Sequence, residues 1–223
     1  RCHGDRASVR SMVVKPPTGA VGQGLANGVA VAMGQRRLGG HFNKAGFELF
    51  TYNACAVWGD GCMMEGICNE AASLAAFHKL SNLCWIYDSN RITIEGSTDL
   101  AFTEDVAGRF TALGWNVLHV ADANDLGAID KAINAFKAET ERPTLIIVVS
   151  HIAFGAPNLQ DTAEAHGAPL GDEEIKLTKQ GYGWPVDETF LVPDEVLDYY
   201  QQGIGKRGKT ASDAWKTLFA KYK

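Results

Sequence analysis

Short apolar stretches alternate along the chain with segments in which apolar side chains recur at helical spacing. Four stretches are nearly continuously apolar and rich in β-branched or aromatic residues: 55–59, 83–88, 116–120 and 144–149. Apolar side chains recur at helical spacing in residues 67–78 and 126–136, and Asn124 is placed to cap the second of these helices. Strands that are covered on both faces of a sheet show such continuous apolar runs. The pattern therefore predicts an α/β fold, doubly wound, with a mainly parallel sheet and helices on both faces.

Further elements are expected on either side of this alternating region. Residues 22–38 are rich in glycine and alanine and predict a helix that packs closely against the sheet or a ligand. Residues 151–171 have no clear period and predict a loop. Helical patterns follow at 172–180, 193–201 and 212–222. The glycine-rich residues 203–209 predict a flexible connector, so we assign residues 1–202 to one domain and residues 203–223 to a connector and terminal helix.

The composition argues against several classes of partner. A formal net charge of −5 and a pI near 5.7 provide no basic surface for nucleic acid or an anionic membrane. The most continuous apolar run, residues 145–149, is too short to span a bilayer. The first residues lack the apolar core of a secretory signal and an initiator Met, so we expect a fragment or a processed chain.

The chain contains five cysteines, an odd number, and no Cys-x-x-Cys pair. This usage is typical of reduced core thiols and predicts a cytoplasmic protein. A zinc site is the alternative interpretation, but the spacing of histidines and cysteines does not support it.

The stretch that carries chemistry is Gly59-Asp60-Gly61, which lies between a predicted strand and a predicted helix. Asn90 follows thirty positions after Asp60, about the length of one strand–helix–strand unit. The two side chains should therefore emerge at the carboxyl ends of neighbouring parallel strands, where open α/β sheets bind ligands. The Asp60 carboxylate, the Asn90 amide oxygen and the Ile92 carbonyl would form half of a hard-oxygen shell for Mg²⁺.

These residues resemble the thiamine-diphosphate motif in the form that the transketolase family uses. The resemblance extends over four ordered blocks: TGAVGQG at 18–24, GDGCMMEG at 59–66 with Asn90, IAFGAPN at 152–158 and AHGAPLG at 165–171. Ala20 and Val21 stand where the family has Pro and Leu, and the family's Gly-His-Pro-Glu block has no counterpart at its usual spacing. His3 is the nearest candidate for the histidine of that block.

The resemblance implies a role for each matched residue. Asp60, Asn90 and the carbonyl of Ile92 would hold Mg²⁺, or Ca²⁺ or Mn²⁺ in its place. The other cofactor contacts would come from Gly19, Ala20, Val21, Gly61, Asn90, Ile94 and His166. His166 would also reach the sugar substrate and act in catalysis, while Glu65 and Glu70 resemble the family's interface carboxylates.

The resemblance also implies an activity: transfer of a two-carbon ketol unit from a ketose phosphate to an aldose phosphate, with thiamine diphosphate as the cofactor. We expect a homodimer, or a complementary chain that carries the pyrimidine-binding domain. Family members contain further upstream residues and further domains that we do not find here. Three alternatives remain: a dihydroxyacetone-synthase-like relative, a subunit or fragment that is inactive alone, and an ordinary nucleotide-binding α/β protein. The last is disfavoured because no Gly-x-Gly-x-x-Gly or P-loop sequence lies between a predicted strand and a predicted helix.

Overall fold

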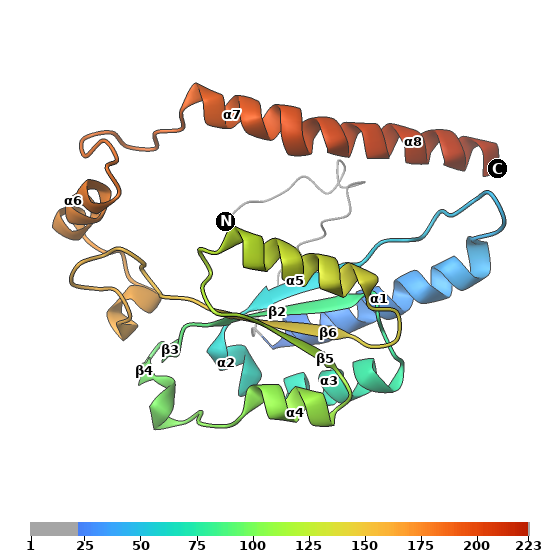
Figure 1. Ribbon diagram of the computed structural model, residues 1–223, viewed down its shortest axis with the longest axis horizontal. Helices are drawn as coiled ribbons and strands as arrows, with labels where there is room; N and C mark the ends of the chain where they lie inside the picture. Colours follow the sequence, from blue (N-terminus) through green and yellow to red (C-terminus); the bar gives the residue numbers. More distant parts are fainter. Residues whose placement is uncertain (1–21, 223) are drawn as a thin grey trace. The chain divides into compact units, whose positions relative to one another are not determined.

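A four-stranded parallel sheet forms the centre of the larger of two structural units (Figure 1). The computed structural model describes residues 22–222. The strands run in the order β1 (Ala54–Trp58), β2 (Leu83–Ser89), β6 (Thr144–Val149) and β5 (Asn116–Val120). Each neighbouring pair is parallel. All four strands occur where the sequence predicts them, within one residue at each end.

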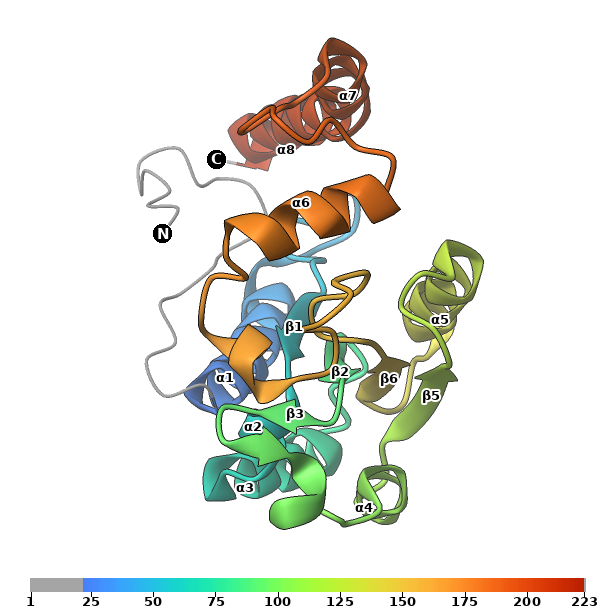
Figure 2. The same ribbon diagram turned by 90° about the vertical axis from the view of Figure 1, so that its left-hand side faces the viewer.

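Helices cover both faces of this sheet. On one face, α1 (Gln23–Phe42), α3 (Gly66–Phe77) and α4 (Val106–Ala112) contribute to a shared apolar core with the strands. On the other face, α5 (Leu126–Ala138) packs on β2, β5 and β6. Figure 2 shows α3 and α4 on the side of the sheet opposite to α5. The predicted fold class is confirmed.

The small residues of α1 allow the close packing that the sequence predicts. A Cβ atom built at Gly28 would lie 3.6 Å from Ala56 Cβ, 3.8 Å from Leu83 Cδ1 and 3.8 Å from Trp85 Nε1. Leu25, Val29 and Ala32 of the same helix are buried. The start of α1 therefore lies directly on β1 and β2.

Three local expectations were wrong. Asp125 caps α5 in place of Asn124, because its carboxylate accepts the N–H of Ala128 at 2.9 Å. The pattern missed α4, a helix of seven residues whose cap is Asp105. The third error concerns β1, which is not covered on both faces in the described structure: Cys55 is exposed and Val57 is 71% exposed.

The segment after β6 is more ordered than a plain loop. It contains the short helix η2 (Ala163–His166) and leads into α6 (Asp172–Gly181). Nearby, β3 (Ile92–Thr93) and β4 (Gly96–Ser97) form a small antiparallel hairpin, followed by η1 (Thr98–Leu100).

The second unit comprises residues 34–52 and 188–222 among those described. It contains α7 (Asp194–Tyr200), the π-helical turn η3 (Gln201–Gly205) and α8 (Lys206–Tyr222). Trp215 Nε1 donates a hydrogen bond of 3.0 Å to the Leu49 carbonyl, and the Phe47 and Tyr222 rings meet edge to face. Residues 203–209 are therefore helical, and the predicted flexible connector is wrong: these contacts of α8 override the low helix propensity of the glycines. The domain boundary after residue 202 stays a prediction.

Candidate functional site

Asp60 is held across the carboxyl ends of two neighbouring strands. It follows β1 by two positions, begins the one-turn helix α2 (Asp60–Met63), and is only 3% exposed. The Tyr87 hydroxyl donates to Asp60 Oδ1 at 2.5 Å, and the backbone N–H of Arg91 donates to Oδ2 at 3.0 Å. Both donors belong to β2 or the turn after it. The parallel register of Trp58 with Tyr87 is what brings them to the carboxylate.

The electrostatic environment of Asp60 favours a positive partner. Burial raises the pKa of the Asp60 carboxyl, and the nearby Asp88 charge acts in the same direction. The hydrogen bonds from Tyr87 and Arg91 oppose this rise. Within residues 22–222 no Lys, Arg or His side chain forms an ion pair with Asp60. A divalent cation would offset the cost of burying this charge.

Asn90, in the turn after β2, and Ile92, the first residue of β3, flank Arg91, whose backbone binds Asp60. Asn90 is the first residue beyond β2, and its Oδ1 accepts the N–H of Ile92 at 2.9 Å. Arg91, which binds Asp60 through its backbone, stands between them in the sequence. The structure thus gathers the three predicted metal-ligating residues at one edge of the sheet. Their role as ligands stays a prediction.

Space for a ligand is present next to Asp60. Apart from its chain neighbours and the backbone of α2, no heavy atom would lie within 4 Å of a Cβ atom built at Gly61, so no other part of the described protein fills this position. Ile94, between β3 and β4, is 69% exposed and offers an apolar surface.

His166 belongs to η2, which packs against β3 and so lies near Ile92. Its side chain is exposed. The segment that carries it is joined to the end of β2, because the Ser150 hydroxyl donates to Asp88 and the Ser150 N–H donates to the Ser89 carbonyl at 3.3 Å. Gly19, Ala20, Val21 and His3 lie outside the described residues.

Glu174 is a supporting residue that the sequence analysis missed. It lies in the first turn of α6, is 8% exposed, and accepts the Asn158 N–H at 2.7 Å, the Asn158 side-chain amide at 2.8 Å and the Leu159 N–H at 3.1 Å. These bonds hold the segment between β6 and η2. Tyr87 was also missed as a partner of Asp60, although it lies in the same stretch as Asn90. In sequence, neither residue differs from an ordinary helix-start acid or strand aromatic.

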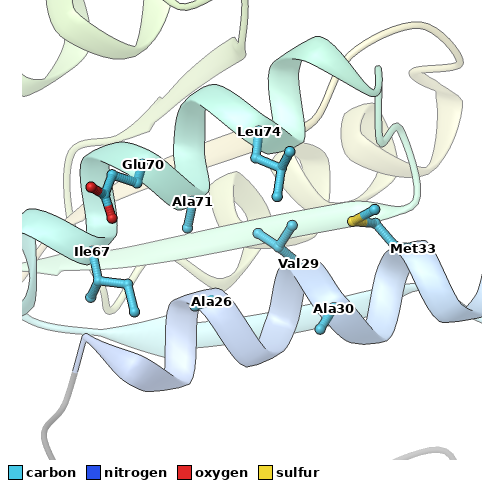
Figure 3. Close-up of a pocket in the computed structure, with 8 residues that line it drawn as sticks. All are labelled: Ala26, Val29, Ala30, Met33, Ile67, Glu70, Ala71 and Leu74. Carbon is cyan, nitrogen blue, oxygen red and sulfur yellow. The ribbon is translucent and has the colours of Figure 1, made fainter.

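Glu65 and Glu70 lie at the start of α3. Glu65 occupies the N-cap position of this helix with extended backbone and without a side-chain capping bond. Its side chain lies against Gly22: a Cβ atom at Gly22 would lie 2.2 Å from Glu65 Oε2. Glu70 lines a groove of about 240 Å³ between α1 and α3 (Figure 3). The other lining residues are apolar: Ala26, Val29, Ala30, Met33, Ile67, Ala71 and Leu74.

Comparison with known proteins decides the family. Residues 1–223 match the family described as "Transketolase, thiamine diphosphate binding domain". The chain belongs to this transketolase family. It is 49% identical to a Streptococcus pyogenes transketolase and 44% identical to transketolase 1 of Saccharomyces cerevisiae, with 94% of this chain covered in each case. The chain spans 28% and 31% of the lengths of these two transketolases.

Solved transketolases share the fold. A Pichia stipitis transketolase in complex with sedoheptulose 7-phosphate matches 90% of this chain with a TM-score of 0.87 and 40% identity. A Leishmania mexicana transketolase matches 94% with a TM-score of 0.87 and 37% identity. The chain covers 30% and 31% of these two structures.

None of the helices in the described region is long and apolar enough to cross a membrane. Nor do residues 22–222 contain a group of three or more His, Cys, Asp or Glu side chains that could hold a metal ion. A metal at the candidate site would therefore depend on amide and backbone oxygens in addition to Asp60.

Proposed function

We propose that this chain anchors thiamine diphosphate in a transketolase that transfers a two-carbon ketol unit from a ketose phosphate to an aldose phosphate. The observation that carries the proposal is the bond between Asp60 and the backbone of Arg91, which joins the end of β1 to the turn that holds Asn90 and Ile92. Membership of the thiamine diphosphate-binding family supports the choice of cofactor.

The residues at this edge fit a hard divalent cation. Asp60, Asn90 and the Ile92 carbonyl supply a carboxylate, an amide oxygen and a backbone oxygen, the donor types that Mg²⁺, Ca²⁺ and Mn²⁺ prefer. The Asp60 and Asn90 oxygens already accept one hydrogen bond each, but each retains a further lone pair for a metal. The pre-existing bonds fix these donors before a metal binds.

Several residues are placed to contact the cofactor around this metal site. Gly61 offers open space and a backbone that a diphosphate can approach closely. Gly19, Ala20 and Val21 are assigned to the same cofactor by their sequence block, and Ile94 to its apolar surroundings. Thiamine diphosphate, when bound, supplies the electron sink for carbon–carbon bond cleavage. The chain's own part is to hold and orient it.

His166 is proposed to bind the diphosphate and the sugar phosphate and to move a proton during transfer. Its support is the packing of η2 against β3, which puts an exposed imidazole on the side of the predicted metal ligands. We propose further that Glu65 and Glu70 face a second copy or a complementary chain with the pyrimidine-binding domain. We also propose that the protein is cytoplasmic and that its cysteines are normally reduced there.

Calorimetric titration of thiamine diphosphate, with and without Mg²⁺, tests this function. We expect Mg²⁺ to strengthen binding strongly, and Asp60→Asn to remove at least tenfold of that metal-dependent affinity, because loss of a partner around a metal typically costs 10–100-fold. Asp130→Asn is a matched control, since Asp130 is a carboxylate on the exposed side of α5, bonded by Asn134. This control should bind as the unmodified chain does.

The result that would contradict the proposal is binding whose affinity does not depend on the metal. Equal affinities for the Asp60→Asn and Asp130→Asn variants would also remove Asp60 from the site. Circular dichroism of each variant separates a lost ligand from a lost fold.

A further inference from the structure

Two cysteines stand opposite each other on neighbouring strands, on the face of the sheet that carries α5. Cys55 of β1 and Cys84 of β2 are direct partners in the parallel register. Register partners project to the same face of a sheet, about 4.8 Å apart. The Cys84 thiol donates a hydrogen bond to the Cys55 sulfur. The two thiols are therefore within hydrogen-bonding reach of each other.

The two thiols differ sharply in exposure. Cys84 is 1% exposed and belongs to the small core formed with Val120, Ala132, Phe136 and Ile146. Cys55 is exposed, because α5 does not cover β1 in the described structure. A reagent from solution can thus reach Cys55, whereas Cys84 is shielded from solvent in the core. This arrangement corrects the expectation that all the strand cysteines are core thiols.

We propose that Cys55 and Cys84 form a peroxide-sensitive thiol pair, in which Cys55 reacts first and Cys84 closes a reversible disulfide. The oxidant is a hydroperoxide from solution. The Cys55 thiolate attacks one peroxide oxygen, so that an S–O bond forms, the O–O bond breaks, and the leaving oxygen departs as water or an alcohol. Cys84 then attacks the Cys55 sulfur, the S–S bond forms, and the hydroxyl leaves with the Cys84 proton as water. Two thiols supply the two electrons that reduce the peroxide.

The local chemistry supports the assignment of Cys55 as the attacking sulfur. The hydrogen bond from Cys84 lowers the pKa of the Cys55 thiol to about 7, against the opposing effect of burial, and the Lys137 charge adds to the lowering. The same hydrogen bond and burial raise the pKa of Cys84. A thiolate, not a thiol, is the nucleophile. By contrast, burial raises the pKa of Cys68 to about 11.

The resulting disulfide should be easy to reduce. The Cβ atoms of a parallel register pair lie about as far apart as the Cα atoms, about 4.8 Å, whereas an unstrained disulfide needs about 3.8 Å. The strands must therefore shift to close the bond, and strained, accessible disulfides have the higher, more labile potentials. The bond would cross-link β1 and β2 near their amino-terminal ends, about 15 Å of strand from Asp60.

Mass spectrometry of the folded 223-residue chain tests the pair. The protein is treated with hydrogen peroxide, free thiols are blocked with N-ethylmaleimide, and peptides are mapped before and after reduction with dithiothreitol. We expect a peptide pair joined through Cys55 and Cys84, which forms in the folded chain and disappears on reduction. A chain unfolded in urea should give mixed pairings, since the register no longer selects the partner.

Three results would overturn the proposal: a preferred disulfide between other cysteines, a Cys55 that stays reduced, or a Cys55 that advances to the sulfinic acid while Cys84 remains free. A second measurement uses Cys84→Ala, in which alkylation of Cys55 at pH 7 should slow by about fivefold as its pKa returns towards the ordinary value. Cys68→Ala is the matched control for the loss of a buried thiol and should leave this rate unchanged. Equal rates in the two variants would contradict the contact. If Cys84→Ala does not fold, the map of the unmodified chain decides alone.

Discussion

Glu174 shows how one side chain can organise a segment that the sequence pattern leaves undefined. Its carboxylate accepts three hydrogen bonds from Asn158 and Leu159, which lie between β6 and η2. Gln160 adds a bond to the N–H of Gly155 at 2.8 Å within the same segment. Side-chain bonds of this kind replace the regular ladders that helices and strands supply. They hold residues 155–160, in the segment that leads to His166.

The pKa of Glu174 leads to a prediction for the pH dependence of this segment. The hydrogen bonds from Asn158 and then from Leu159 lower the pKa of the carboxyl below its ordinary value of 4.5. A lowered pKa in the folded state contributes stability that is present above the unfolded-state value and is lost as the pH falls through the folded-state value. The amide resonances of Asn158 and Leu159 should therefore titrate together in NMR spectra, with a midpoint below 4.5.

Glu174→Gln should abolish this titration, because the neutral amide keeps the size of the side chain but has no charge to lose. Glu173→Gln is the control: Glu173 is the neighbouring exposed acid, paired with Lys176 at 2.9 Å. If the two amides of the unmodified chain shift only above pH 4.5, Glu174 does not hold them in the way described.

At the residue scale, sequence reasoning located Asp60 and Asn90 but not the groups that hold them. The spacing of thirty residues is enough to place both at adjacent strand ends, because one strand–helix–strand unit has about that length. The bonds of Asp60 to the Tyr87 hydroxyl and to the Arg91 backbone depend on the exact register of β1 with β2. Register cannot be derived from apolar runs that lack alternation. The contacts that Tyr87 and Arg91 make with Asp60 could therefore not be predicted from the sequence.

At the element scale, Gly28 and Gly155 differ in whether the fold leaves room for a side chain, and substitution by alanine tests this difference. Gly28 lies within α1, and an added Cβ would make ordinary contacts of 3.6 to 3.8 Å with β1 and β2. Gly155 has a φ of +81°, and an added Cβ would lie 2.7 Å from the Tyr182 hydroxyl oxygen. The first glycine is replaceable by alanine and the second is not.

Gly28→Ala should raise the free energy of unfolding by about 0.5–1 kcal/mol, because alanine lowers the entropy of the unfolded chain and is the better helix former. Gly155→Ala should lower it by at least about 1 kcal/mol, since alanine is strained at positive φ. Urea unfolding followed by tryptophan fluorescence measures both. A destabilised Gly28→Ala variant would show that α1 packs more tightly on the sheet than the described contacts indicate.

The elements that sequence reasoning missed or misread share a physical cause. The seven residues of α4 are too short to show a clear period, yet Asp105 caps the helix and Phe110 packs beside Trp115 in the core. Residues 203–209 contain three glycines and still form part of a helix, since α8 is held through Trp215 and Tyr222. In both cases tertiary contacts outweigh local propensity.

At the scale of the whole molecule, this chain is about one third as long as the transketolases that it matches. It spans 28–31% of the first transketolases it matches. Covered on one face only, β1 leaves Cys55 and Val57 exposed in the described structure. Under the proposed function, ketol transfer also requires groups that act on the cofactor's ring and on both sugars, and among the described residues we propose such a role for His166 alone.

The 223-residue polypeptide on its own should therefore bind Mg²⁺–thiamine diphosphate without turning over sugars. Binding needs only the groups around Asp60, whereas acceleration of the chemistry requires a complete set of oriented groups. A coupled assay with xylulose 5-phosphate and ribose 5-phosphate, run beside a full-length transketolase, measures this. Turnover by the polypeptide that vanishes in Asp60→Asn would show that these residues suffice for catalysis and would overturn the prediction. Turnover that survives in Asp60→Asn would indicate a contaminating enzyme, and repetition after a further purification step would then decide between the two outcomes.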